Sequence, residues 1–561
     1  MANSELIAEL QRIVGSKHVI TNAKSMKRFC KGYRSGEGEA IAVVRPGTLL
    51  EQWKTVQACA AADKIIIMQA ANTGLTEGST PKDTYDREVV ILNTMRMSQI
   101  QLIRDGKQIV SFPGATLFAL EQLLRPLGRQ PHSVIGSSTI GASIVGGVCN
   151  NAGGSLCERG PSYTELALYA EIKEDGQVEL VNHLGIDLGD DPETILTRLE
   201  HGDYTEEQVE DTNRKASDTN YPQWIRDVDA DTPSRYNGDA TRLYGISGCA
   251  GKRLVFAARL DTYATYEREQ VFYLGTTDTT VLTKLRRDFL KTFKTLPVSG
   301  EYMHTEAYAF TKVYGKDTLV LIDKLGTDRL PKLFAIKGWL DARLNKLPLL
   351  PKNMIDRILQ GISYLWPNPL MTRMEEFHDR FPHHLILKMH DDGIEEAEAY
   401  LKEHMDGTVS DWFACTPREA KVASLHRFAA AGVPVRYAAV NPEKVSDILA
   451  LDIALRRNDT DWFEVLPDEI AEGISHKVYY GHFFCHVMHQ DYVIKKGYDP
   501  KEIKAEMLKI LDKRRAQYPS EHNVGHIYHA SEDQKAFFKA CDPTNSLNPG
   551  IGKMSKQKHY A

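Results

Sequence analysis

SVIGSSTIGASIVGGVCNNAGGS (residues 133–155) is the most informative segment of this 561-residue chain. It contains six glycines, and a seventh, Gly160, follows shortly after it. A backbone that lies against a pyrophosphate group needs N–H groups aimed at the anion and no Cβ atoms in the way. The spacing differs from the GxGxxG of a nicotinamide-binding crossover. Taken alone, the same glycines would also suit tight turns between packed strands.

A second glycine-containing segment, AANTGLTEGSTP (70–81), directly follows the β-branched run KIIIMQA (64–70). A short apolar run of this kind, ended by turn residues, indicates a buried strand. A second glycine loop at the end of a strand favours binding of a phosphate group over the tight-turn interpretation.

The elements around these loops indicate two kinds of domain. Residues 1–62 are typical of helices, and strand-like runs follow to about residue 185, before an acid-rich segment at 202–233 that we expect to be a solvated insertion. From about residue 265, strands and long helices alternate, and the last fifty residues regain the Gly, Asn and Pro character of the first half. We therefore predict an α+β protein with one domain at 1–265, completed by 510–561, and a cap domain at 266–509.

The composition limits the functions and the cellular compartments that this chain can have. A chain of 561 residues should form two or three domains. The net charge of −6 leaves no basic excess for a nucleic-acid partner. The eight cysteines include no CxxC pair, which argues against a disulfide framework or a zinc ribbon and favours a reducing compartment. The first twenty residues lack the features of a signal peptide, and no run approaches 18 apolar residues, so we expect a cytosolic protein or one bound to a membrane surface from the cytosolic side.

The two glycine loops resemble those of the vanillyl-alcohol-oxidase-type (PCMH-type) flavoproteins, where they hold the pyrophosphate of FAD. SGCAGKRLVFAAR (247–259) and DPTNSLNPGIGK (542–553) extend the resemblance to both ends of the chain. It implies a PCMH-type, two-part FAD-binding domain that holds FAD non-covalently. Carried over onto the matching positions, the cofactor contacts would be Ala70, Ala71, Asn72, Thr73, Gly74, Gly78, Ser79, Gly136, Ser143, Gly153 and Val255.

Over nearly its whole length the chain is similar to the bacterial respiratory branch of this family, for example in DILALDIALRRNDT (447–460) and YGHFFCHVMHQDY (480–492). The similarity implies FAD-dependent oxidation of D-lactate to pyruvate, by hydride transfer from C2 to flavin N5, with membrane quinone as the electron acceptor. Another D-2-hydroxy acid (glycolate, malate or 2-hydroxyglutarate) is the alternative substrate. A metal-dependent hydrolase is the alternative from a different class.

Oxidation of a 2-hydroxy acid needs a base for the hydroxyl proton and a cation for the carboxylate. Glu521–His522 resembles the EHG element of FAD-linked 2-hydroxy-acid dehydrogenases, although Asn523 replaces the glycine. Since a histidine pKa lies near neutrality, His522 is the expected base. Arg427 matches an arginine of the family and Arg457 stands where relatives carry a lysine, so both are expected to bind the substrate carboxylate.

His482 and His489 are seven residues apart, as are the metal-ligating histidines of the relatives' GHxGDGNxH motif. With Glu521 as the oxygen ligand, they would suit zinc or manganese. The segment FFCH (483–486) replaces GDGN, which removes the expected glycine turn. The alternative is that both histidines bind the substrate carboxylate or line an aromatic core.

A basic segment lies within the cap. Between Lys324 and Arg357, eight basic residues outnumber three acidic ones and are mixed with leucine, phenylalanine and tryptophan. This mixture is typical of an interfacial segment on anionic lipid. We therefore expect residues 320–380 to contact the membrane, with the protein peripheral to the cytoplasmic face of the bacterial inner membrane. An amphipathic hairpin packed on the cap is the alternative, and the oligomeric state stays open.

Overall fold

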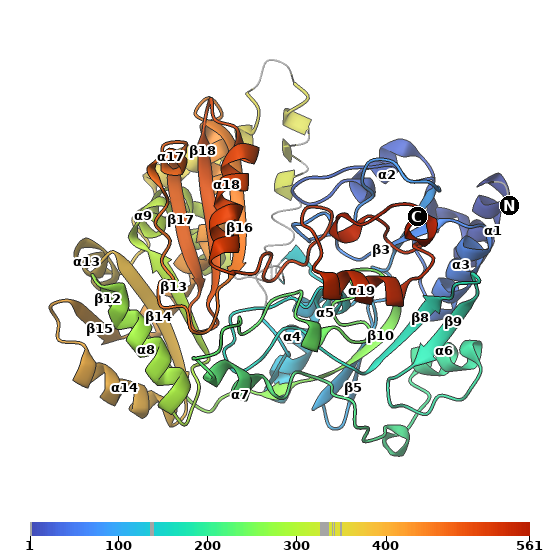
Figure 1. Ribbon diagram of the computed structural model, residues 1–561, viewed down its shortest axis with the longest axis horizontal. Helices are drawn as coiled ribbons and strands as arrows, with labels where there is room; N and C mark the ends of the chain where they lie inside the picture. The colour runs from blue at the N-terminus through green and yellow to red at the C-terminus, as the bar shows by residue number, and fades with distance from the viewer. Residues whose placement is uncertain are drawn as a thin grey trace.

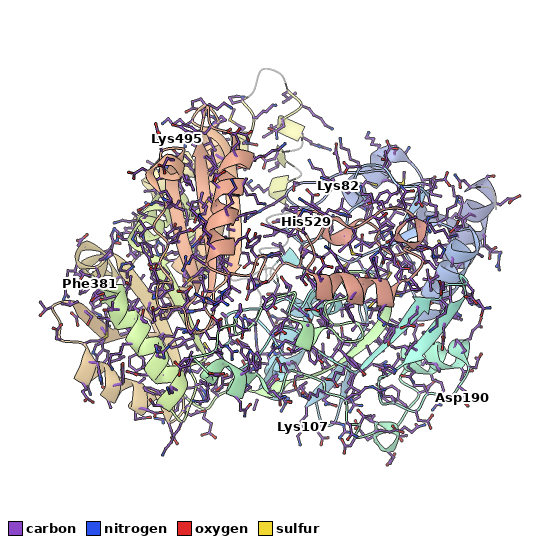
Figure 2. The ribbon with its side chains drawn as sticks, in the orientation of Figure 1. Lys82, Lys107, Asp190, Phe381, Lys495 and His529 are labelled. Carbon is purple, nitrogen blue, oxygen red and sulfur yellow. The ribbon has the colours of Figure 1, made fainter. Side chains whose placement is uncertain are left out.

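The protein is described here from a computed structural model that covers residues 3–134, 138, 140–325, 336–338, 340–341, 343–347 and 351–561. Its elements form two halves that lie side by side (Figure 1). The N-terminal half and the C-terminal segment occupy one side, and the cap with its large sheet occupies the other. In Figure 2, Asp190 and Lys107 mark the first half, and Lys495 marks the end of the last strand of the cap. The predicted α+β, PCMH-type class is confirmed by this arrangement and by the solved structures reported below.

The first sheet has the strand order β1-β2-β4-β3. Its strands β2, β4 and β3 are parallel and strongly apolar, as expected for strands covered on both faces. Helices α1, α2 and α3 are packed in the same region and bury their apolar faces. The bounds are α1 Asn3–Val14, β1 Val19–Ile20, α2 Ala23–Cys30, β2 Ala42–Val44, α3 Leu49–Ala61, β3 Ile65–Gln69 and β4 Val89–Asn93.

The second sheet is antiparallel, with the order β5-β6-β10-β8-β9. Its central strand, β10, is buried along nearly its whole length, which explains its apolar run at residues 254–258. The bounds are β5 Ile100–Ile103, β6 Gln108–Ser111, α4 Leu117–Leu124, β7 Arg129–Gln130, α5 Ile144–Cys149, β8 Ala167–Ile172, β9 Val178–Asn182, α6 Pro192–His201, α7 Tyr221–Arg226, β10 Leu254–Asp261 and β11 Tyr263–Ala264.

The cap is built on a seven-stranded antiparallel sheet of order β15-β12-β14-β13-β17-β18-β16. Its strands are β12 Glu269–Thr276, β13 Ser299–His304, β14 His383–His390, β15 Ser410–Ala414, β16 Val445–Ala454, β17 Ile474–His482 and β18 Val487–Lys495. Its helices are α8 Thr279–Thr292, α9 Thr305–Tyr314, α10 Lys316–Leu325, α12 Met354–Leu365, α13 Thr372–Arg380, α14 Gly393–His404, α15 Pro417–Ala429, α16 Val433–Val440, α17 Asp468–Ala471 and α18 Pro500–Lys513.

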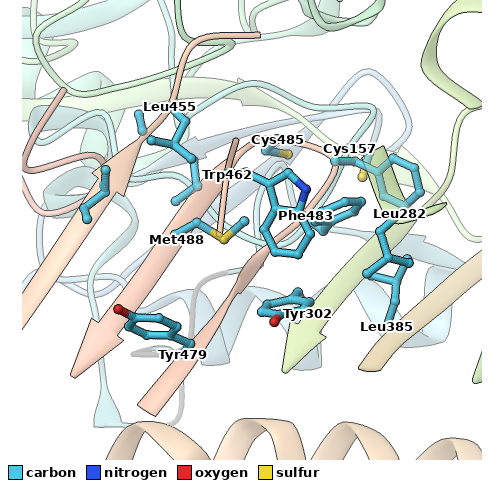
Figure 3. Close-up of a cluster of buried hydrophobic side chains, with 14 of the residues drawn as sticks. Cys157, Leu282, Tyr302, Leu385, Leu455, Trp462, Tyr479, Phe483, Cys485 and Met488 are labelled. Carbon is cyan, nitrogen blue, oxygen red and sulfur yellow. The ribbon is translucent and has the colours of Figure 1, made fainter. Parts of the chain in front are cut away.

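One face of the cap sheet carries an aromatic core (Figure 3). Trp462 is 2% exposed and its ring lies edge-on to those of Tyr302 and Phe483, at 4.9 Å from each. Cys157, from the N-terminal half, is buried in the same cluster beside Cys485 of the cap. The two halves therefore share part of one hydrophobic core.

The acid-rich segment 202–233 differs from the solvated insertion that its composition indicates. Tyr221, Ile225 and Val228 are at most 1% exposed and belong to the cap core. The interpretation was wrong for this part, because α7 places Tyr221 and Ile225 on one helical face, and burial of these apolar side chains outweighs the charge of their neighbours.

The C-terminal segment returns from the cap to the first half. Ser520 N donates to Asp452 O of β16, and further along Ile66 N of β3 donates to Ser546 O while Asn548 N donates to Ile66 O. Helix α19, Glu532–Cys541, lies between these two points. We propose domain boundaries near residues 265 and 520, since α18 packs its buried Ile503, Met507 and Leu511 into the cap core.

Candidate active site

The loop after β3 is folded by its own side chains. Asn72 has a φ of 55°, donates from Nδ2 to Lys31 O at 2.8 Å and accepts the Ser79 hydroxyl at 2.9 Å. Gln69 Nε2 donates to Ser79 O at 2.8 Å. These bonds close residues 70–79 into a rigid turn at the end of a buried strand.

The glycines of this loop border open space. A Cβ atom added to Gly74 would meet no atom within 4 Å, and one added to Gly78 would meet only Gly525 Cα at 3.9 Å. Gly141, from the long glycine segment, faces the same loop, because its Cβ would lie 3.9 Å from Ala71 Cβ. Loops from two distant parts of the chain thus come together and leave room for a bulky group, which fits the pyrophosphate of FAD.

The other predicted cofactor contacts are placed differently. Ser143 caps α5 and accepts Gly146 N–H at 3.0 Å, and Val255 is a buried residue of β10 whose carbonyl accepts from Gln52. A Cβ on Gly153 would lie 2.1 Å from Glu521 Oε1, so this glycine packs against a carboxylate. Gly136 lies outside the described residues. Ala70 and Thr73 belong to the first loop, where Ala70 O accepts from Asn93 Nδ2 at 3.0 Å.

The C-terminal NPG segment joins the glycine loops. Asn548 Nδ2 donates to Gly78 O at 2.7 Å and to Ala250 O at 3.0 Å. Lys252, which is fully buried, donates to Asn545 Oδ1 at 2.7 Å. The tail therefore ties the loop after β3 to the segment that leads into β10.

A histidine cluster lies on one face of the cap sheet. Glu301 of β13 is opposite His482 of β17, and Asp452 of β16 is opposite His489 of β18. Tyr480, two residues before His482, is also opposite His489. Cross-strand partners point to the same face of a sheet, as do residues two apart on one strand. The register of four adjacent strands therefore gathers these side chains.

The β17–β18 connection explains the seven-residue spacing of the histidines. Phe483 and Phe484 are buried in the cap core, and His486 takes a φ of 53°. The Nδ1 atom of His486 lies 3.0 Å from Arg456 O, which holds this conformation. A tight turn thus forms without the glycine of the relatives' motif.

His522 and Asp452 form a dyad. His522 Nδ1 lies 2.7 Å from Asp452 Oδ2, and because a carboxylate only accepts, the histidine donates from Nδ1. Its Nε2 then carries the lone pair, and the side chain is 32% exposed. Burial lowers the pKa of His522, but the Asp452 carboxylate more than offsets this and leaves it above the ordinary value. Asp452 also accepts Glu521 N–H at 2.6 Å, which fixes the backbone beside the histidine.

His482, His489 and Glu521 bring one ligand atom each within 4.8 Å of one another. The two Nε2 atoms are 3.3 Å apart, and Glu521 Oε2 lies 3.7 Å from one and 3.8 Å from the other. His482 Nδ1 donates to Glu301 Oε1 at 2.7 Å, so its Nε2 carries a lone pair. A proton or a cation must therefore lie between the two rings.

Carboxylates and cations set the charge of this cluster. Burial raises the pKa of Glu301, but His482 and Arg427 outweigh it and hold the value at about 2. Burial lowers the pKa of His489 to about 3, which keeps that ring neutral, as a metal ligand must be. Burial also lowers the pKa of His482, yet Glu301 and Glu521 bring it above the usual value.

The two predicted substrate arginines differ in their surroundings. Arg427 Nη2 pairs with Glu301 Oε2 at 2.8 Å and its guanidinium lies 4.3 Å from the Tyr480 ring centroid, so it joins the cluster. Arg457 donates to the carbonyls of Thr232 and Trp224 and to the Thr232 hydroxyl. Its donors are engaged by residues of the first half, and we leave it out of the proposed site.

Sequence reasoning missed Asp452, Glu301 and Arg235. The Arg235 guanidinium is 2% exposed, pairs with Glu521 Oε1 at 2.9 Å and donates to Gly154 O. Asp452 did carry a signal, since it interrupts the otherwise apolar run ILALDIA (448–454). Its partner could not be identified, because seventy residues separate it from His522.

Comparisons with known proteins show which families the chain resembles. Residues 40–179 match the family described as FAD binding domain, and residues 271–560 match the one described as D-lactate dehydrogenase, membrane binding. The chain is 53% identical over 559 residues to the quinone-dependent D-lactate dehydrogenase of Escherichia coli K12, covering 100% of this chain and 98% of the relative. The protein of the same description from Corynebacterium glutamicum is 43% identical over 560 residues, covering 99% and 98%.

Two solved structures share the fold. Substrate-bound p-cresol methylhydroxylase superposes with a TM-score of 0.59 at 12% identity, covering 98% of this chain and 97% of that one. Alkyldihydroxyacetonephosphate synthase also gives 0.59, at 10% identity, covering 98% and 85%. In the described part of the chain, no helix has the length and apolar character needed to cross a bilayer.

Proposed function

Because the chain belongs to the family of quinone-dependent D-lactate dehydrogenases, we propose that His522, Asp452 and the neighbouring histidine cluster form the site at which it oxidises its substrate. The chain is an FAD-dependent oxidoreductase that acts on D-lactate and delivers electrons to quinone. The observation that carries the assignment of the site is the His522–Asp452 dyad, whose free Nε2 atom belongs to a partly exposed side chain.

The proposed role of His522 is to take the hydroxyl proton of D-lactate. Bound FAD would accept the hydride from C2 and later give the two electrons to quinone. Loss of a hydride from C2 and a proton from the hydroxyl converts lactate into pyruvate. Asp452 holds the ring so that Nε2 stays the accepting atom, and it stabilises the imidazolium that forms.

The glycine loops are proposed to hold the FAD pyrophosphate. The support is the open space beside Gly74, Gly78 and Gly141, at the place where loops from two distant parts of the chain meet. Gly153 and Ser143 would act indirectly, the first by letting Glu521 approach and the second by capping α5.

A divalent ion is proposed between His482, His489 and Glu521. Facing lone pairs beside a carboxylate favour a cation, and zinc or manganese would suit two imidazoles and one oxygen. Such an ion would polarise the substrate oxygens. A proton shared by the two imidazole rings is the alternative that the same geometry allows.

The metal proposal is tested by calorimetry on the FAD-loaded enzyme. Zn²⁺ or Mn²⁺ should bind at one site in the wild type and in His529→Ala, whose exposed histidine lies outside the cluster. Binding should be lost in His489→Ala. Equal binding in all three proteins would remove the metal from the proposal.

Membrane association is proposed to use helix α12. This helix buries Gln360 and Ser363 while Ile358 is 48%, Ile362 40% and Leu365 84% exposed. The three exposed residues follow the spacing of one helical face. The helix thus exposes an apolar face and buries polar groups on its other side, which supports shallow insertion into a lipid surface.

Basic residues would add the attraction to anionic lipid. Lys346 and Lys352 are exposed in the chain just before α12, whereas Lys337 is paired with Asp341 and Asp356. Lys332 and residues 334 and 339 of the basic segment lie outside the described residues. We propose that the cytoplasmic face of the inner membrane, where anionic lipid and quinone meet, is the surface contacted.

The function is tested by the visible spectrum of the purified protein. D-lactate added without oxygen should bleach the flavin band, L-lactate should leave it, and a soluble quinone should restore it. A colourless protein that remains active as a hydrolase would overturn the assignment.

A further inference from the structure

A loop of the N-terminal half lies close to the segment that carries His522. Ser35 Oγ donates to Glu77 Oε1 at 2.7 Å, and Gly36 packs so tightly that a Cβ atom there would lie 2.5 Å from the Glu77 carboxyl carbon. The preceding residue, Thr76, donates from Oγ1 to His522 O at 2.9 Å. The adjacent residues Thr76 and Glu77 therefore link the loop 31–37 to His522.

Arg34 belongs to this loop and has no partner among the residues that the structure describes. Its side chain is exposed, and no hydrogen bond, ion pair or ring contact joins it to another of the described residues. The two arginines that contact the cluster are engaged, Arg235 by Glu521 and Arg427 by Glu301. In the described part of the chain, Arg34 is thus a guanidinium near the dyad that no protein group engages.

The charge of Arg34 reaches the groups that surround the dyad. Burial, with Asp452, raises the pKa of Tyr528 to about 12, and Arg34 is the charge that opposes the rise. Tyr528 lies on the C-terminal segment, six residues after His522, so the guanidinium acts on this segment from the first half.

We propose that Arg34 binds the carboxylate of the 2-hydroxy acid while His522 faces its hydroxyl group, an inference that rests on the proposed function. The two polar groups of such an acid sit on adjacent carbons, so the cation and the base must lie close together. A guanidinium binds a carboxylate through two parallel hydrogen bonds and fixes its plane. Arg34 therefore selects an acid and orients C2, and the first half of the chain contributes to substrate specificity.

The test measures flavin reduction in anaerobic stopped flow, with D-lactate and with the neutral analogue D-lactamide. Arg34→Gln should raise the Kd for D-lactate by roughly 10- to 100-fold, the size expected for a lost charge-assisted hydrogen bond. The Kd for D-lactamide should change little, so the preference for the acid shrinks. The Kd of Arg34→Lys for D-lactate should fall between that of the wild type and that of Arg34→Gln.

Arg28→Gln is the matched control. Arg28 is another exposed arginine, six residues earlier on α2, and its guanidinium lies 4.6 Å from the Phe29 ring centroid. This variant should keep the wild-type Kd for both compounds, and all variants should retain FAD.

The outcomes separate the inference from the proposed function. If D-lactate fails to reduce the flavin of the wild type, the proposed function falls. If the wild type is reduced but Arg34→Gln keeps its preference for D-lactate over D-lactamide, Arg34 does not bind the carboxylate. A variant that binds less FAD is assayed with excess FAD, and an unchanged preference there overturns the inference as well.

Discussion

Substitution of Gly153 by alanine tests how the long glycine segment works. The added Cβ would lie 2.1 Å from Glu521 Oε1 and 2.6 Å from the Glu521 carboxyl carbon, so the carboxylate must move. Its Oε1 atom is held by Arg235 at 2.9 Å and by Gly154 N–H at 3.1 Å, and the two charged side chains are 10% and 2% exposed. The substitution therefore breaks a buried ion pair.

The expected cost follows from that pair. Breaking a buried ion pair destabilises a protein by about 3–5 kcal/mol. Arg235 keeps the carbonyls of Gly154 and Leu156 as acceptors, so we expect a loss near the lower end, about 3 kcal/mol. Flavin reduction by D-lactate should slow too, since Glu521 adjoins His522.

The assay is denaturant unfolding in excess FAD, repeated in a Glu521→Ala background. Without the carboxylate the alanine has no clash, so its cost should fall well below its cost in the wild type. Gly74→Ala is the control, because its Cβ meets no protein atom within 4 Å and should weaken FAD retention while leaving the apoprotein as stable as before. Equal costs of Gly153→Ala in both backgrounds would refute the role assigned to Glu521.

Three further changes test other parts of the molecule. His522→Ala should keep FAD and slow flavin reduction by D-lactate by roughly 10²–10⁴-fold, the usual worth of a general base, while quinone reoxidation measured in stopped flow barely changes. Burial lowers the pKa of Lys252 to about 8, so above that pH the unfolded state binds more protons than the folded state. The free energy of unfolding of the wild type, relative to Lys252→Met, should therefore rise by roughly 2 kcal/mol between about pH 8 and 10. A difference that does not change with pH would count against this. Serine at Ile358, Ile362 and Leu365 should reduce vesicle binding at all salt concentrations while turnover with a soluble dye persists; unchanged co-sedimentation would remove α12 from the membrane contact.

Local patterns determined much of the FAD-binding half. The run Ile65–Gln69 is apolar and β-branched, and the glycines that follow it have a conformational freedom that depends on the residue itself. His522 was predicted as the base from its motif, and the structure gives it a carboxylate partner. These features can be predicted from the sequence because strand, turn and loop preferences depend on a few neighbouring residues.

The partners of the site residues were decided by tertiary structure. Asp452 meets His522 because β16 lies at one edge of the cap sheet and the C-terminal segment pairs with it. The same long-range packing engages Arg457 with Trp224 of the first half, leaves Arg34 without a partner among the described residues and turns the apolar side of α12 outward. The sequence alone does not show whether an arginine is buried against carbonyl groups or exposed beside a dyad. Its availability for substrate depends on strand register and on contacts between residues hundreds of positions apart, and the local sequence around an arginine encodes neither.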